Sequence, residues 1–218
     1  RSDCADLPYF LRFYYAWKRG LPFSHVAEVD PRGRSRDIRY SAGGNLVAAR
    51  RDILSGSDAL AVMRRLRDGI SSATYRIDPE LETPLAQDFY SPALTPGGIR
   101  PGTVIYDPNG HLAVVFRVER NGRIHYIDAH PDNSLTRGTY DLRFVRAAPG
   151  MGAGFKNWRP LRLEGARLEG GVFTGGRMVL APNQAIGDFA LTQYYGTGAR
   201  PEDSWRNGAF TIAGRRLD

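Results

Sequence analysis

The feature that most constrains the fold is the stretch from His111 to Ala129, in which two β-rich arms flank the dipeptide Asn121-Gly122. Asn-Gly between apolar residues is the strongest short-range signal for a β-hairpin. With these two residues as the turn, Arg120 faces Arg123, and the residue numbers of every facing pair add up to 243. The sequence therefore predicts an antiparallel pair of strands at the centre of the fold.

This register divides the side chains of the hairpin between two faces. One face is expected to pack on the core because it is apolar; it carries Leu112, Val114, Phe116, Val118, Ile127 and Ala129. The other face combines small or apolar residues with titratable ones; it carries His111, Ala113, Val115, Asp128, His130 and Asp132. We expect the chemistry of the protein on this second face.

Two amphipathic helices are expected before the hairpin. The first covers residues 7–18 and is followed by Gly20 and Pro22; its inward face is predicted to hold Leu7, Leu11, Tyr14 and Tyr15. The second covers residues 58–68 with Ser57 as its cap; its inward face is predicted to hold Leu60, Met63 and Leu66. Residues 21–56 and 78–102 are rich in turn-forming residues and are expected to be irregular, and residues 139–147 are expected to add a strand.

Composition and charge narrow the class of protein. The 218 residues carry a formal net charge of +7, and 42% of them are hydrophobic, which is typical of a globular domain. No apolar run approaches the roughly 20 residues that span a bilayer, so no membrane span is expected. The basic stretches at residues 31–39 and 63–69 lack interleaved aromatic residues, so we expect no specific nucleic-acid binding. The oligomeric state is left open.

Cys4 is the only cysteine of the chain, which excludes an internal disulfide framework and a multi-cysteine metal cage. Its thiol is a buried filler, a surface group or a nucleophile. The polar setting Ser2-Asp3-Cys4-Ala5-Asp6, just ahead of a helix, favours the nucleophile. A helix N-terminus and a nearby imidazolium both lower the pKa of a thiol. A helix capped by Asp6 would place Pro8 in its first turn, where proline is tolerated.

A cysteine nucleophile also needs an imidazole within hydrogen-bond reach and a third polar group that orients this imidazole. The hairpin offers both kinds of residue on one face. It offers no set of zinc ligands, because the register places His125 on the apolar face, away from Asp128 and His130. We therefore expect no metal and no cofactor.

Three segments together resemble the NlpC-type branch of the papain-like cysteine peptidases: Asp-Cys-Ala-Asp-Leu at residues 3–7, the strand-like stretch at 101–115, and His-Tyr-Ile-Asp-Ala-His-Pro at 125–131. The order cysteine, histidine, polar residue is the order of that family. The resemblance implies an α+β, papain-like fold in which a helix carrying the cysteine packs on an antiparallel sheet. It also implies a peptide or amide hydrolase that acts on peptidoglycan stem peptides in the bacterial cell envelope, either periplasmic or secreted.

Carried over by position, the resemblance makes Cys4 the nucleophile, His111 the general base and Asp128 the residue that orients His111. The predicted register, in which facing residue numbers add up to 243, does not settle which residue orients His111. It pairs Asp128 with Val115, about 13 Å from His111 at the rise of a strand. It brings His130 closer, and it places Asp132 opposite His111. His130 is therefore the alternative third residue, unless a bulge shifts the register.

The expected organisation is a catalytic domain over residues 1–148, with an insertion at about 24–95, and a C-terminal extension over 149–218 packed on it. Two other functions fit the same residues. One is a transglutaminase-like acyltransferase or an amidase on the same fold. The other is a non-catalytic module that binds cell wall or another polyanion.

Overall fold

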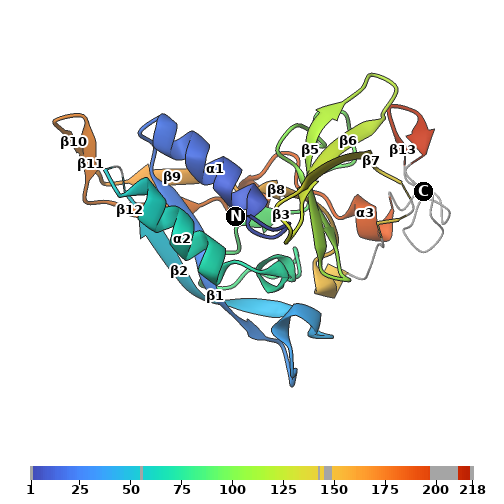
Figure 1. Cartoon of the computed structure of the whole chain (residues 1–218), viewed down its shortest axis with the longest axis horizontal. Coiled ribbons are helices and arrows are strands. Elements are labelled where there is room, and N and C mark those ends of the chain that lie inside the picture. Colours follow the sequence, from blue (N-terminus) through green and yellow to red (C-terminus); the bar gives the residue numbers. More distant parts are fainter. Residues whose placement is uncertain (1, 55, 142, 145–148, 197–210, 217–218) are drawn as a thin grey trace.

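The computed structural model describes residues 2–54, 56–141, 143–144, 149–196 and 211–216. Its centre is a six-stranded antiparallel sheet with the strand order β3-β8-β4-β5-β6-β7 (Figure 1). The strands are β3 (Phe89–Tyr90), β4 (Val104–Asp107), β5 (His111–Val118), β6 (Ile124–Ala129), β7 (Leu135–Thr139) and β8 (Gly154–Trp158). The predicted hairpin is present as β5 and β6, two neighbouring strands inside this sheet.

Helix α1 (Leu7–Lys18) has the predicted bounds but turns a different face to the core. Its buried aromatic side chains are Tyr9 and Phe13, which join a cluster with Val104, Tyr106 and Leu112 of the sheet. The residues predicted to face inward are largely outside; Leu11, Tyr14 and Tyr15 are about half exposed. The helix has two apolar sides, and the side that carries Tyr9 and Phe13 packs into the core, because buried aromatic side chains remove a large apolar area from water.

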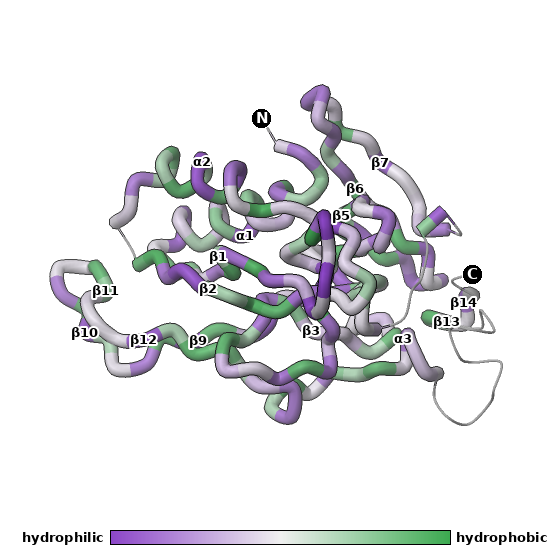
Figure 2. Tube along the Cα trace, turned by 90° about the horizontal axis from the view of Figure 1, so that it is seen from below, coloured by the Kyte–Doolittle hydropathy of each residue, from purple (hydrophilic) through white to green (hydrophobic). Residues whose placement is uncertain are grey.

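Helix α2 (Ala59–Gly69) packs beside α1 (Figure 1) and is amphipathic, with hydrophobic and hydrophilic segments alternating along its turns (Figure 2). Its cap is Asp58, whose carboxylate accepts hydrogen bonds from the N–H groups of Leu60 and Ala61, so the expected Ser57 cap is wrong. Val62 and Leu66 are fully buried, whereas Leu60, expected inside, is exposed.

Residues 21–56 were expected to be irregular and instead form a long antiparallel hairpin of β1 (Phe23–Pro31) and β2 (Asn45–Ile53). The first half of β1 is buried and the second half alternates toward solvent. Two register shifts around Glu28 interrupt the pairing. Because the burial pattern changes within one strand, the period of its hydrophobic residues does not predict it as a strand.

Both faces of the central sheet are covered, which corrects the expectation of one apolar and one polar face. The face opposite α1 packs a second cluster that includes Ile105, Ala113, Val115 and Phe155. Phe116, expected in the core, is 42% exposed. The predicted site residues lie at the end of the sheet where β5 begins and β6 ends.

The expected division at residue 148 does not separate two units, because β8 lies between β3 and β4 in the sheet. Residues 24–95 also belong to the same core, to which they supply α2 and β3. Beyond β8, β9 (Leu161–Glu164) pairs with β12 (Arg177–Leu180), and β10 (Arg167–Glu169) with β11 (Val172–Thr174), in a ribbon that projects from the body (Figure 1). The short elements α3 (Thr192–Tyr195), β13 (Thr211–Ile212) and β14 (Arg215–Arg216) lie toward the opposite end.

The strand expected at residues 139–147 comes earlier in the chain, as β7, and residues 142 and 145–148 lie outside the described residues. Helices long and apolar enough to cross a bilayer are absent from the described part of the chain.

Candidate functional site

The pairing of β5 with β6 sets the geometry of the candidate site. The hairpin closes with a hydrogen bond from the N–H of Glu119 to the carbonyl of Arg123, so its loop has three residues, with Gly122 at a φ of 83°. A register shift between Val115 and Arg117 follows. The facing pairs beyond it, such as Val114 with Ile127, add up to 241, so the predicted register of 243 is wrong.

The new register brings Asp128 to His111. On the sum of 241, Asp128 lies opposite Ala113, which makes it the diagonal neighbour of His111 on the same face. The Nε2 atom of His111 lies 2.7 Å from Oδ2 of Asp128. The His111 side chain is 39% exposed and that of Asp128 only 6%. The structure thus joins these two predicted site residues directly.

Asp128 is held by a further hydrogen bond that fixes its orientation. The hydroxyl of Thr136, on β7, donates to Oδ1 of Asp128, while Oδ2 faces His111. Because an ionised carboxylate only accepts hydrogen bonds, Nε2 of a neutral His111 carries the proton. Nδ1 is then the basic nitrogen of the ring.

The two alternative third residues have other positions. His130 stacks beside His111 with ring centroids 6.0 Å apart, and its Nε2 lies 3.1 Å from the Thr136 hydroxyl and 3.7 Å from Oδ2 of Asp128. His130 therefore lies beside both the His111 ring and the carboxylate that orients this ring. Asp132 accepts hydrogen bonds from Ser134 in an exposed turn and does not take the place opposite His111.

Cys4 lies in a turn that leads into α1. The carboxylate of Asp3 caps this turn by accepting hydrogen bonds from the N–H groups of Ala5 and Asp6. The helix itself begins at Leu7, after Asp6, as the position of Pro8 requires. The Tyr75 hydroxyl donates to the carbonyl of Ala5 at 2.5 Å and ties the turn to the core.

The Cys4 thiol lies against the start of β5. It donates to the carbonyl of Gly110, the residue before His111, with Sγ and the oxygen 3.8 Å apart. Burial raises the pKa of the thiol; the Leu112 N–H lowers this pKa and the Asp3 carboxylate raises it. The expectation that the helix start would lower the pKa of Cys4 is therefore wrong.

Five residues around the site were not predicted from the sequence. Thr136 and Tyr75 orient Asp128 and the Cys4 turn, as described above. Gly110 has a φ of 98°, and a Cβ at this position would lie 3.3 Å from the Tyr40 hydroxyl and 3.7 Å from Oγ of Ser72. Only the glycine gave a signal, as the last residue of the turn Asp-Pro-Asn-Gly; the others belong to segments whose fold was not predicted.

Groups of three or more metal-binding side chains do not occur among the described residues. His125, which was considered as a ligand, faces Glu119, with Nε2 and Oε1 2.8 Å apart.

Comparisons of the chain with protein-family models, curated proteins and solved structures find no match.

Proposed function

We propose that the protein is a cysteine hydrolase that cleaves a peptide or amide bond through Cys4, His111 and Asp128. One observation carries the proposal. The imidazole of His111 is hydrogen-bonded to a buried carboxylate, and the only thiol of the chain lies against the residue that precedes His111. A nucleophile beside a base that a third group orients is the arrangement used in covalent catalysis.

The proposed reaction begins from the thiol form of Cys4. Nδ1 of His111 takes the thiol proton as the sulfur attacks the substrate carbonyl, which gives a tetrahedral oxyanion. Asp128 stabilises the imidazolium that forms. His111 then gives the proton to the leaving amine, and the carbon–nitrogen bond breaks. Water, deprotonated by His111, attacks the thioester and releases the acid, which restores the Cys4 thiol.

The backbone N–H of Cys4 is the proposed donor to the oxyanion. The N–H groups of Ala5 and Asp6 are already bonded to Asp3. One such donor contributes about 10²-fold or more to an acyl transfer.

We further propose a papain-like fold of the NlpC type and a peptidoglycan stem peptide as substrate. The short resemblance in sequence supports both, and the helix beside an antiparallel sheet is the arrangement that it implies. An envelope location follows from that substrate.

Digestion of purified peptidoglycan sacculi, followed by mass spectrometry of the soluble products, tests the proposal. The unaltered protein is expected to release peptides whose masses include one added water per cut. Cys4→Ala and His111→Gln are each expected to reduce the release at least 10³-fold. The matched control is His125→Gln, which removes a histidine paired with Glu119 outside the site.

Three outcomes would contradict hydrolysis at Cys4. Products that join two peptides without added water would indicate an acyltransferase. Binding to sacculi with no product would indicate a non-catalytic cell-wall module. Full activity of Cys4→Ala would place the chemistry elsewhere.

A further inference from the structure

A groove with a volume of about 520 Å³ runs between the outer side of α1 and the sheet. Its α1 side is formed by Pro8, Leu11, Arg12 and Tyr15, and its sheet side by residues of β5, β6 and β8 that include Val114, Phe116 and Trp158. This is the second apolar side of α1, the one that does not enter the core.

Large apolar side chains remain exposed along this groove. Tyr15 is 58% exposed, Leu11 48% and Phe116 42%. Exposed apolar residues that gather around one concave surface are typical of a binding groove. The groove therefore suits a ligand with apolar parts.

Arg12 gives the groove a positive charge that has no carboxylate in direct contact among the described residues. Its guanidinium carbon lies 4.8 Å from the ring centroid of Trp158, which is a cation–π contact. Within the described chain it makes no ion pair and no hydrogen bond. Burial lowers the pKa of this guanidinium and the charge of the Asp88 carboxylate raises it; the group remains charged at neutral pH. An anion that entered the groove would supply a partner in direct contact.

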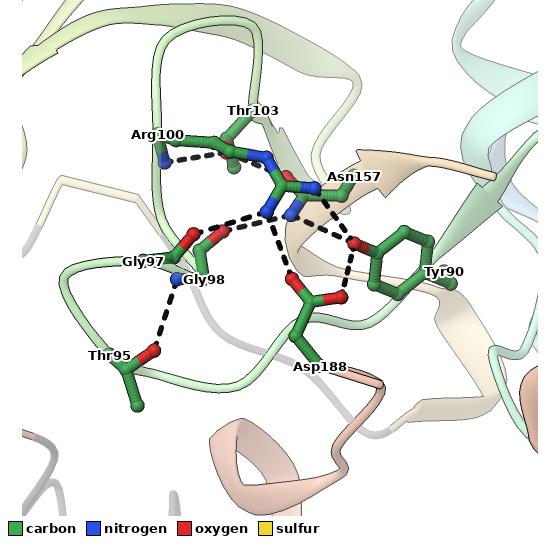
Figure 3. A network of polar contacts seen from close by, with 8 residues as sticks. All are labelled: Tyr90, Thr95, Gly97, Gly98, Arg100, Thr103, Asn157 and Asp188. Carbon is green, nitrogen blue, oxygen red and sulfur yellow. Dashed lines mark hydrogen bonds and ion pairs between the residues drawn. The ribbon is translucent and has the colours of Figure 1, made fainter. Parts of the chain in front are cut away.

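The second arginine of the groove is already paired. Arg100 binds Asp188 at 3.1 Å and the Tyr90 hydroxyl at 3.0 Å (Figure 3). Asn157 and Thr103 extend the same network, because the Thr103 hydroxyl donates to Asn157 and accepts from the N–H of Arg100. These bonds fix the wall from Arg100 to Thr103 and leave Arg12 as the cation available to a ligand.

The groove follows α1 from Pro8 to Tyr15, along the helix that leads out of the Cys4 turn. Val114 is three positions from His111 on β5, so the side chains of these two residues lie on opposite faces of the strand. The groove is therefore a surface on the α1 side of the sheet, separate from the contact between His111 and Asp128.

We propose that this groove binds a peptide in an extended form, and that Arg12 binds a free carboxylate of this peptide. The inference rests on the proposed function for the assignment of this peptide as a substrate. It adds a substrate class, namely peptides that combine a carboxylate with apolar groups.

Fluorescence anisotropy with two peptides tests this without catalysis. The probes are fluorescein-labelled Ala-Leu-Glu-Ala-Leu amide and the same peptide with glutamine in place of glutamate. On the Cys4→Ala protein, the glutamate peptide is expected to bind at least tenfold more tightly. Arg12→Gln should abolish this preference and Arg12→Lys should retain part of it. The matched control is Arg64→Gln, which removes an equal charge from the exposed side of α2.

Equal binding of the two peptides to the Cys4→Ala protein would overturn the inference, and so would an equal loss in Arg12→Gln and Arg64→Gln. Tyr15→Glu keeps the test decisive if Arg12→Gln fails to fold. It changes an exposed residue and places a carboxylate three positions from Arg12 on α1, where it should occupy the guanidinium and remove the preference. If the protein prefers the glutamate peptide but does not hydrolyse sacculi, only the proposed function is refuted. If it hydrolyses sacculi but shows no preference for glutamate, only the binding of a carboxylate in the groove is refuted.

Discussion

At the scale of single residues, the decisive contact is between His111 and Asp128. The carboxylate is almost fully buried and receives hydrogen bonds on both oxygens, from His111 and from Thr136. Such a group can hold an imidazole in one tautomer and stabilise its charged form.

Asp128→Asn tests this role. The amide can donate a hydrogen bond to Nε2, which would move the ring proton to Nδ1 and remove the base that Cys4 needs. We expect kcat/KM to fall by about 10² to 10⁴-fold while the fold is kept. Initial rates of peptide release measure the loss, and circular dichroism checks the fold.

Asp132→Asn is the control for this change, because Asp132 lies in an exposed turn of the same hairpin end. It should retain full activity. If Asp128→Asn and Asp132→Asn were equally active, Asp128 would have no part in orienting His111.

At the scale of elements, the sequence predicts the hairpin but not its register. Asn121 and Gly122 signal a turn correctly, yet Gly122 closes a three-residue loop, and one more shift occurs near Phe116. Each shift changes the partner of every residue beyond it. The predicted register places Asp128 about 13 Å from His111. Because of the two shifts, Asp128 is instead hydrogen-bonded to His111.

The helices show what periodicity can and cannot settle. The spacing of apolar residues predicts the bounds of α1 well, because Asp6, Pro8 and Gly20 mark its ends. It does not tell which apolar side enters the core, since that depends on the elements packed against it. The distant partners Thr136 and Tyr75 could not be found either, because local pattern holds no information on contacts between remote segments.

Strand β8 carries a charge in the interior. Lys156 is 1% exposed, faces Val104 across the sheet and makes no ion pair within the described chain. Burial lowers the pKa of its ammonium group to about 7, with a further lowering by Arg159 and an opposing effect of Asp78. The unfolded chain binds this proton up to about pH 10.5, so stability rises with pH between about 7 and 10.5.

Lys156→Met should therefore stabilise the protein, and do so most at low pH. We expect the free energy of unfolding at pH 6 to increase by on the order of 3 to 5 kcal/mol, with a much smaller gain at pH 10. Urea denaturation at both pH values measures it. Lys18→Gln, at the exposed end of α1, should show no such dependence on pH. A gain that did not change with pH would mean that the ammonium charge is not the cause.

At the scale of the whole molecule, Asp88 joins segments that are far apart in the sequence. Its Oδ2 accepts hydrogen bonds from the Tyr9 hydroxyl of α1 and the Val26 N–H of β1, each at 2.7 Å. Its Oδ1 is 2.7 Å from Nη2 of Arg50 on β2. Asp88 directly precedes β3, so one buried carboxylate holds the helix, the long hairpin and the edge of the sheet together.

Asp88→Asn tests whether this carboxylate is required. The variant leaves the largely buried guanidinium of Arg50 without a counter-charge and places an amide among groups that donate hydrogen bonds. Breaking a buried pair in this way costs about 3 to 5 kcal/mol. We expect a corresponding fall in the free energy of unfolding in urea, whereas Asp37→Asn, which breaks an exposed pair with Arg39, should leave the midpoint unchanged.

The double variant Asp88→Leu with Arg50→Met separates the charge from the packing. If the cost arises from the unpaired guanidinium, replacing both partners by apolar side chains should restore most of the lost stability, because a buried ion pair contributes little over apolar groups of similar volume. If the double variant is as unstable as Asp88→Asn, the bonds from Tyr9 and Val26 are what hold these segments, and Asp88 acts as a hydrogen-bond acceptor rather than as a counter-charge. In either case α1, which leads out of the Cys4 turn, depends on a residue that follows Tyr9 by 79 positions.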